Sequence, residues 1–267
     1  MSSSHTPVLS AKDIRTFLDN KTNQQLRNIA IHSSVSSTND ELWSSLSQGS
    51  QTPEVCISES QTAGRGRRGD QWQSPPSGNL YLSLSWSFPA ETMQNGLSIA
   101  IGVSLINTLK SEGIKDLQLK WPNDVLHKRK KLAGILVESR FGKQLNTVIG
   151  IGLNFKLPTA SIKKIQQPTT SLQQLCTQVP CRNKLAGKII QTMINTLEKF
   201  QQHGLRDFLA PFSDYDALKG ETITLISEKT QQEVIALGIN QEGELQYQLN
   251  DTLLTLSNSH TSIRFSS

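Results

Sequence analysis

The stretch Leu80–Phe88, LYLSLSWSF, alternates bulky apolar residues with mostly small polar ones. A period of two places the apolar residues on one side of an extended chain, so we expect a strand with one apolar face. Shortly after it, leucine and isoleucine recur every four residues between Leu97 and Leu109, which is the spacing of an amphipathic helix, and Gly113 offers a stop. A strand with one apolar face needs a cover, which this helix can supply. We therefore expect a sheet packed by helices.

Similar patterns elsewhere extend this expectation to an α+β fold, in which a mixed or antiparallel sheet is packed by helices. Further helices are expected at Ala11–Leu18, Asn39–Ser47 and Lys184–Gln202. Further strands are expected at Val55–Ile57, Leu117–Trp121, Gly134–Ser139 and Thr147–Phe155. A basic turn, His127–Lys131, is expected between the second and third of these strands.

After Tyr215 the pattern changes to short strand-like runs that are separated by glycines and an Asn-Asp pair. The runs are Thr222–Ile226, Glu233–Ile239, Leu245–Leu249 and Leu253–Leu256. Short strands with a turn signal about every ten residues are typical of a small β-barrel. We therefore divide the chain into an N-terminal extension with the first helix (1–30), a central domain (31–215) and a C-terminal barrel (216–267).

Composition excludes several classes of protein. No apolar run approaches the roughly 20 residues of a membrane span, and the N-terminus lacks the pattern of a secretory signal. The three cysteines, Cys56, Cys176 and Cys181, have neither zinc nor redox spacing, which favours a cytoplasmic protein. The net charge of +5 permits acidic partners but does not by itself indicate nucleic-acid binding.

The segment Gly64–Gly69, which we call the Gly/Arg loop, interleaves three glycines with three arginines, and Trp72 follows it. Glycine lets a backbone approach a ligand closely, and the arginine fork suits phosphate and carboxylate oxygens. The loop formally satisfies the dinucleotide pattern G-x-G-x-x-G, which requires a helix that starts within the motif. Pro75 and Pro76 stand where that helix would continue, so we reject the dinucleotide interpretation. An anion-binding loop and an exposed basic loop remain.

Four other motifs can have either a functional or a structural role. Lys120–Val125, KWPNDV, is either a ligand-binding strand end or an ordinary Asn-Asp turn. Lys131–Glu138, KLAGILVE, begins with a lysine that either enters a pocket or belongs to a solvated basic turn. The glycines of Gly150–Asn154, GIGLN, mark either the close approach of a ligand or a β-bulge. Ser37–Asn39 is either a binding segment or the N-cap of the next helix.

Taken together and in this order, these motifs resemble those of the biotin–protein ligase family. The match includes the Gly/Arg loop with Trp72, the intact Lys120–Asp124 segment, Lys131–Glu138, Gly150–Asn154, Ser37–Asn39 and Gln61. The resemblance implies an SH3-like C-terminal barrel. It also implies a two-step reaction, in which ATP activates biotin to biotinyl-5′-AMP with release of pyrophosphate. A lysine of a biotin carboxyl carrier protein, which belongs to acetyl-CoA carboxylase, then takes the biotin.

The resemblance also implies roles for individual residues. The implied biotin pocket consists of Ser37, Thr38, Asn39, Gln61, Arg65, Gly66, Arg67 and Lys131. The implied nucleotide site consists of Arg67, Arg68, Trp72, Asn123, Asp124, Lys131 and Asn154. The implied catalytic residues are Lys131, Arg65 and Arg67, with Lys131 as our first choice. Mg²⁺ is expected to arrive on the ATP phosphates, and no residue is assigned to the metal.

Some family members carry an N-terminal DNA-binding module, and the 36 residues before Ser37 are too few for it. We therefore expect no sequence-specific DNA binding and no repressor role. A homodimer is compatible with the family resemblance. A lipoate or octanoyl ligase of the same fold is the near alternative, although those relatives lack the pairing of Gly64–Gly69 with Lys120–Asp124. A nucleic-acid-binding module is the remote alternative, since an Arg/Gly loop, a tryptophan and a small barrel also suit single strands.

Overall fold

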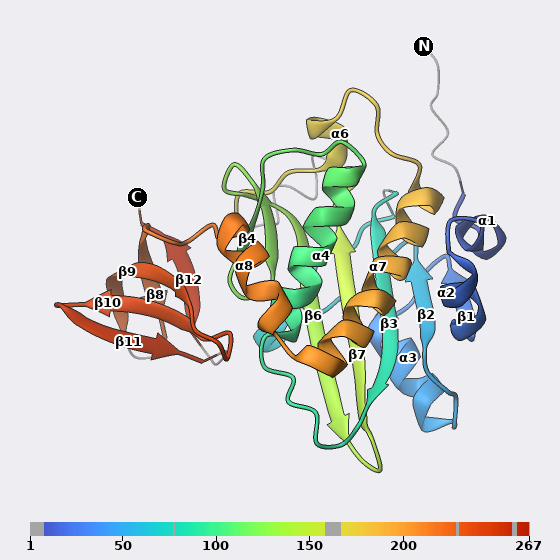
Figure 1. Ribbon diagram of the computed structural model, residues 1–267. Helices are drawn as coiled ribbons and strands as arrows, with labels where there is room; N and C mark the ends of the chain where they lie inside the picture. Colours follow the sequence, from blue (N-terminus) through green and yellow to red (C-terminus); the bar gives the residue numbers. More distant parts are fainter. Residues whose placement is uncertain (1–7, 77, 158–166, 228–229, 258–260, 267) are drawn as a thin grey trace.

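The computed structural model describes residues 8–76, 78–157, 167–227, 230–257 and 261–266 (Figure 1). Its larger sheet has seven strands in the order β1-β2-β3-β7-β6-β5-β4. Their bounds are β1 Asn28–His32, β2 Glu54–Ser58, β3 Leu80–Phe88, β4 Leu117–Lys120, β5 Asp124–His127, β6 Lys130–Phe141 and β7 Leu145–Leu153. β1 and β2 run parallel, and the other neighbouring strands run antiparallel. The predicted mixed sheet is therefore confirmed.

Helices cover both faces of this sheet. The helices are α1 Ala11–Arg15, α2 Asn20–Gln25, α3 Thr38–Ser47, α4 Leu97–Ser111, α6 Leu172–Leu175, α7 Arg182–His203 and α8 Arg206–Tyr215. α4 and α7 lie side by side across one face, as Figure 1 shows, and the apolar residues of β3 join them in the main core. α3 packs on the other face, against β2, β3 and β7. The fold is thus α+β, as predicted.

The polar face of β3 differs from the sequence expectation because it is buried as well. Ser83 and Ser85 are fully buried under the side of the sheet that α3 covers. The hydroxyl of Ser83 donates to Asn39 Oδ1 over 2.6 Å, and the hydroxyl of Ser85 accepts from the backbone N–H of Glu54. Small hydroxyl side chains let the helix approach closely while each buried polar group keeps a partner. Both faces of β3 are therefore buried: the apolar residues pack in the main core, and the serines are buried with hydrogen-bond partners.

Several short elements escaped the sequence analysis. The sequence patterns did not predict β1, β5, α2, α6 or α8. The predicted basic turn His127–Lys131 is shorter than expected, because only Lys128 and Arg129 turn, both with positive φ, between β5 and β6. Asp124 accordingly begins a strand, whereas we had placed it after one.

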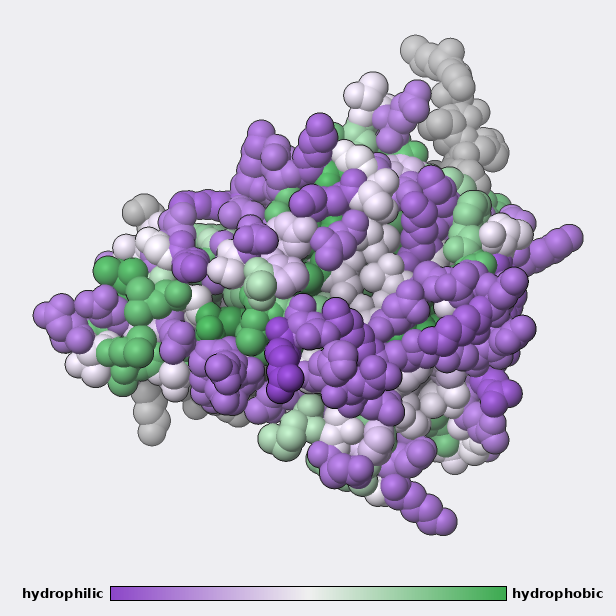
Figure 2. Space-filling model, in the orientation of Figure 1, coloured by the Kyte–Doolittle hydropathy of each residue, from purple (hydrophilic) through white to green (hydrophobic). Residues whose placement is uncertain are grey.

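The C-terminal sheet has five antiparallel strands in the order β11-β10-β9-β8-β12, consistent with a small barrel-like domain. They are β8 Thr222–Ile226, β9 Gln231–Ile239, β10 Leu245–Leu249, β11 Thr252–Leu256 and β12 Ser262–Phe265, of which β12 was not predicted. In Figure 2 apolar side chains gather at the left, where Figure 1 places this sheet. Ile235 and Leu237 of β9 and Leu253 of β11 are exposed.

Contacts between the two parts of the fold bear on where the domains divide. The indole N–H of Trp121 donates to the carbonyl of Gly243 over 2.8 Å, and Leu119 forms a β-bridge with Asp216. We propose a domain boundary at residue 216, between the end of α8 and the start of β8. Leu9 and Ile14 lie in the main core, so we group α1 and α2 with the larger domain. No helix in the described part of the chain is both long and apolar enough to cross a membrane.

Candidate functional site

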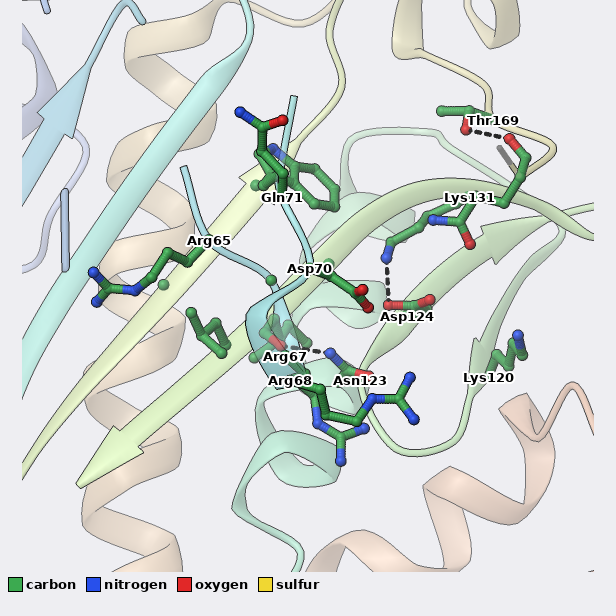
Figure 3. Close-up of a pocket in the computed structure, with 18 of the residues that line it drawn as sticks. Arg65, Arg67, Arg68, Asp70, Gln71, Lys120, Asn123, Asp124, Lys131 and Thr169 are labelled. Carbon is green, nitrogen blue, oxygen red and sulfur yellow. Dashed lines mark hydrogen bonds and ion pairs between the residues drawn. The ribbon is translucent and has the colours of Figure 1, made fainter. Parts of the chain in front are cut away.

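A cavity of about 840 Å³ lies between the larger sheet, the Gly/Arg loop and β12 (Figure 3). Every site residue that the sequence analysis named lines it: Ser37, Thr38, Asn39, Gln61, Arg65, Gly66, Arg67, Arg68, Trp72, Asn123, Asp124, Lys131 and Asn154. These residues come from the start of α3, the loop between β2 and β3, the turn before β5, strands β5 and β6, and the residue that follows β7, which are far apart in sequence. Their convergence makes the cavity the candidate active site.

One wall of the cavity is a hydrogen-bonded cluster at the start of α3. The backbone N–H and the hydroxyl of Thr38 approach Gln61 Oε1 at 2.9 and 3.2 Å. The Thr38 hydroxyl also lies 2.6 Å from Ser83 Oγ. Ser37 holds the N-cap position, but its hydroxyl makes no capping bond. Ser37 therefore occupies the N-cap position, as one of the two interpretations predicted, but its hydroxyl does not accept a hydrogen bond from the helix N–H groups.

The strand glycines create space for two side chains from other segments. A Cβ at Gly150 would lie 2.6 Å from Asn39 Oδ1, and one at Gly152 would lie 2.4 Å from Trp72 Cε2. Gly134, directly opposite Gly152 in the β6–β7 pairing, would also meet the Trp72 ring. The pairing of β7 with both neighbours continues unbroken through these positions, so the alternative of a β-bulge is wrong. Gly134 and Gly152 form a floor on which the indole lies, and Gly150 leaves room for Asn39.

Placing a methyl group on this floor should displace the indole. We expect Gly152→Ala to shift the Trp72 indole N–H signal in a ¹H–¹⁵N spectrum, assigned with Trp72→Phe, because the new Cβ overlaps the ring. If the ring moves aside, the free energy of unfolding should fall by at most about 1–3 kcal/mol, the usual cost of overpacking. Gly142→Ala is the matched control, since its Cβ would meet its nearest neighbour at 3.7 Å. An unchanged Trp72 signal would contradict this placement.

The Gly/Arg loop doubles back on itself. The N–H of Gly66 donates to the carbonyl of Asp70 over 2.6 Å, and the N–H of Trp72 donates to the carbonyl of Gly64 over 2.9 Å. A 3₁₀ turn, η1 Arg67–Gly69, forms its tip, and no helix follows it. This geometry agrees with rejection of the dinucleotide motif. Gly64 is required by close contact, because a Cβ there would lie 2.7 Å from the carbonyl oxygen of Trp72.

Arg65 is engaged at the edge of the cavity. Its guanidinium bonds to Asp40 Oδ1 over 2.5 Å and to both carboxylate oxygens of Glu138 over 3.0 Å. The hydrogen bond that the guanidinium donates to Asp40 is the main cause that raises the pKa of Arg65, and Glu138 adds to it. Figure 3 shows this side chain directed away from Lys131 and Asp124. The family resemblance had implied a place for Arg65 in the biotin pocket and among the catalytic residues.

Lys131 points into the cavity and meets a carboxylate. Its Nζ lies 2.8 Å from Asp124 Oδ1 and 5.0 Å from the centre of the Trp72 ring. Both charged side chains are mostly buried, 14% and 16% exposed, whereas Lys128, Arg129 and Lys130 beside them are exposed. The interpretation of Lys131 as part of a solvated basic turn is therefore wrong.

Two asparagines fix the backbone around this pair. The side-chain amide of Asn123 donates to the carbonyl of Ile135 over 2.7 Å. The side-chain amide of Asn154, which is buried, donates to the carbonyl of Thr170 over 3.2 Å. Both residues line the cavity, yet their amide N–H groups are used to hold strands and loops in place. A scaffold role therefore accompanies any contact they make with a ligand.

The end of the cavity beside the C-terminal sheet is basic. Lys120 Nζ donates to the carbonyl of Ile263 over 2.7 Å, and the Arg68 guanidinium donates to the Ser262 hydroxyl over 2.8 Å. Burial, followed by repulsion from Arg68, lowers the pKa of Arg67. Burial likewise lowers the pKa of Lys120, with Asp124 opposing the shift. Crowded, partly desolvated cations are stabilised by an anion, so this end suits a polyphosphate.

Some residues in the cavity lining, and two carboxylates beside it, were missed by sequence reasoning. Asp40 and Glu138 hold Arg65, while Lys120 and β12 close the basic end. Lys120 and Glu138 stood inside motifs that had been singled out, so a signal existed for both. β12 gave none, because a four-residue strand near the chain end has no period of its own. Within the described residues, no group of three or more His, Cys, Asp or Glu side chains is placed to hold a metal ion.

Comparison with known proteins identifies the family. Residues 31–154 match the biotin/lipoate A/B protein ligase family. Over 243 residues the chain is 34% identical to the bifunctional ligase/repressor BirA of Escherichia coli, which covers 89% of this chain and 73% of that protein. The chain belongs to the biotin protein ligase family. It is also 32% identical to the biotin–[acetyl-CoA-carboxylase] ligase of Mycobacterium tuberculosis, over 62% of this chain and 63% of that protein.

A solved biotin protein ligase shares the fold. The enzyme from Aquifex aeolicus in complex with biotin and ATP superimposes with a TM-score of 0.75 at 24% identity, over 90% of this chain and all of that chain. The segment that matches the family model, residues 31–154, contains all thirteen site residues named from the sequence. The family assignment and the cavity therefore point to the same part of the chain.

Proposed function

We propose that the protein joins biotin to a lysine of a biotin carboxyl carrier protein in two steps, through biotinyl-5′-AMP. The main support is Lys131, whose ammonium group lies against Asp124 and beside Trp72 in the cavity that also contains the α3 cluster. One ammonium group therefore stands between a pocket rich in neutral hydrogen-bonding groups and a basic pocket. That order fits biotin at one end and ATP at the other.

The first step brings two anions together. The biotin carboxylate attacks the α-phosphorus of ATP, an acyl–phosphate bond forms, and pyrophosphate leaves with the electrons of the broken P–O bond. Preorganised cations at this point stabilise the charge that develops in the transition state. We assign this role to Lys131 and Arg67, which line the cavity, and the basic end formed by Lys120 and Arg68 suits the departing pyrophosphate.

Mg²⁺ fits the same end of the cavity. Carboxylate oxygens and phosphates are its usual ligands, and the carboxylates of Asp70 and Asp124 line the cavity. When bound to ATP, the ion neutralises phosphate charge. Asp124 also forms an ion pair with the Lys131 ammonium over 2.8 Å and thereby orients this cation.

The pocket at the start of α3 suits the ureido ring of biotin. This ring has one carbonyl and two N–H groups, so it needs donors and acceptors on the same surface. Thr38, Asn39 and Gln61 offer hydroxyl and amide groups that are already oriented by mutual hydrogen bonds. The dithiolane ring of lipoate has no such groups. This observation favours biotin over the lipoate or octanoyl alternative.

The second step needs protection from water as well as an incoming lysine. The carrier lysine attacks the acyl carbon of the adenylate, an amide bond forms, and AMP leaves. A mixed anhydride hydrolyses if water reaches it, so the site must be covered. The Gly/Arg loop and Trp72 lie across the cavity, and the buried indole N–H of Trp72 has no hydrogen-bond partner among the described residues. We propose that the Gly/Arg loop covers the bound adenylate and keeps water away from it.

The proposal is tested by thermal unfolding with biotin, ATP–Mg²⁺ or both, followed by labelling of a purified carrier protein. A ligand that binds only the folded state raises the unfolding midpoint, and formation of a trapped adenylate should raise it by more than the sum of the two separate shifts. The carrier should then gain one biotin at a single lysine, with lipoate unable to compete. Folded protein that shows neither the joint shift nor carrier labelling would contradict the proposal. A homodimer, a cytoplasmic location and the lack of operator binding stay predictions.

A further inference from the structure

Glu138 of β6 receives hydrogen bonds from three side chains on two separate segments. Its Oε2 accepts from Asn39 Nδ2 over 2.7 Å and from the indole N–H of Trp43 over 3.3 Å, and both of these residues lie on α3. Its two oxygens also accept from the Arg65 guanidinium at 3.0 Å. A single carboxylate thus joins the pocket wall, the Gly/Arg loop and the sheet.

The contact with Asn39 sets the orientation of a buried amide. Asn39 is only 3% exposed, and its Oδ1 accepts from the Ser83 hydroxyl over 2.6 Å while its Nδ2 donates to Glu138. An amide has one accepting end and one donating end of nearly equal shape, so its neighbours decide which way it points. An ionised Glu138 can only accept hydrogen bonds, so the NH₂ group of Asn39 must face it. The Asn39 oxygen is then directed toward Ser83 and Gly150.

The contact with Arg65 connects the same carboxylate to the loop. Arg65 is shared between Asp40 and Glu138, and its side chain is 35% exposed. An ion pair of such exposure contributes little by itself. The ion pair affects ligand binding instead, because a ligand carboxylate that enters the cavity must compete with Asp40 and Glu138 for the Arg65 guanidinium. Glu138 therefore influences both the pocket wall and the arginine.

We propose that Glu138 is a positioning residue of the biotin pocket, which fixes the Asn39 amide for the ligand and anchors Arg65 of the Gly/Arg loop. The inference rests on the proposed function, since it takes biotin as the ligand of this pocket. Glu138 itself does not line the cavity, so it acts through Asn39 and Arg65.

The experiment measures the biotin dissociation constant by calorimetry for the wild-type protein and Glu138→Gln. Glutamine keeps the size of the side chain but presents one accepting and one donating end, which lets the Asn39 amide turn over. Hydrogen bonds to charged groups are strong enough that we expect the dissociation constant to rise about tenfold to a hundredfold. Glu41→Gln is the matched control, because it removes the same charge from α3 outside this set of hydrogen bonds, and it should leave the constant unchanged.

A double-mutant cycle separates positioning from general stability. Because Glu138 acts partly through Asn39, adding Glu138→Gln to Asn39→Ala should raise the dissociation constant by much less than Glu138→Gln raises it in the wild-type protein, since only the Arg65 contact is left to lose. Asp40→Asn removes the other anchor of Arg65 and leaves the Asn39 contact intact, so it should weaken biotin binding less than Glu138→Gln does. Thermal midpoints of all variants check that the fold persists.

The outcomes distinguish the inference from the function on which it rests. Wild-type protein that binds biotin, together with a Glu138→Gln variant that binds it equally well, would overturn the inference and leave the function intact. Fully additive effects of Asn39→Ala and Glu138→Gln would also overturn it, because Glu138 would then act independently of Asn39. Wild-type protein that fails to bind biotin would overturn the proposed function and the inference together.

Discussion

Replacing Lys131 by alanine is expected to slow biotin adenylation by about 10²–10³-fold, the usual effect of removing one preorganised charge-stabilising group. The Lys131 ammonium lies 2.8 Å from Asp124, in the cavity that also contains the α3 cluster and the basic end. Pyrophosphate release in the presence of biotin and ATP measures the loss. The fold should survive, because the cavity is open enough for water to solvate the carboxylate left behind.

Two further variants make this result interpretable. Lys131→Met keeps the aliphatic stem beside the Trp72 ring and removes only the charge, so it should be as slow as the alanine variant. Lys130→Ala removes the exposed neighbouring cation from the same strand and should retain full activity. Equal losses of activity and thermal stability in the Lys131 variants would instead identify a structural lysine.

Arg67→Gly is expected to release the adenylate from the site. Arg67 stands at the tip of the Gly/Arg loop, where burial and Arg68 lower its pKa, so its charge is most stable when a ligand anion is near. Loss of a charged hydrogen bond of this kind should speed dissociation of biotinyl-5′-AMP about tenfold to a hundredfold. The free adenylate should then biotinylate exposed lysines of any protein present. Streptavidin blotting of a mixture of unrelated proteins measures this labelling.

The control for this prediction is Lys143→Gly, which removes a cation from the exposed turn between β6 and β7. It should label only the carrier lysine. If adenylate leaves the Arg67→Gly variant no faster than it leaves the wild-type protein, the Gly/Arg loop does not cover the intermediate.

The long elements were predictable because their periods are strong and local. β3, α4 and α7 follow from alternation or from apolar residues every three to four positions. β3 has the predicted bounds, whereas α7 begins two residues earlier and ends one residue later than expected. β1 was missed because its five residues gain order only by parallel pairing with β2, across the whole of α3. β5 was missed because four residues, Asp124–His127, are too few to show a period. Tertiary contacts determine whether such short segments form strands.

The membership of the site was predictable from the motifs, but its internal contacts were not. All thirteen named residues line one cavity, because the motifs lie where strands and loops meet it. The pairing of Arg65 with Asp40 and Glu138 depends on three segments that are remote in sequence, so no local pattern reports it. Close approach of a ligand was one of two interpretations of the strand glycines, and the structure was needed to show that side chains, Asn39 and Trp72, approach them.

The central claim, that this cavity joins biotin to ATP, is tested most directly by exchange of labelled pyrophosphate into ATP. Because adenylation is reversible, exchange reports the first step without any carrier protein. We predict exchange that requires biotin and Mg²⁺, is not supported by lipoate, and is lost in Lys131→Ala but retained in Lys130→Ala. Folded protein that gives no biotin-dependent exchange, or exchange that lipoate supports equally well, would contradict the claim.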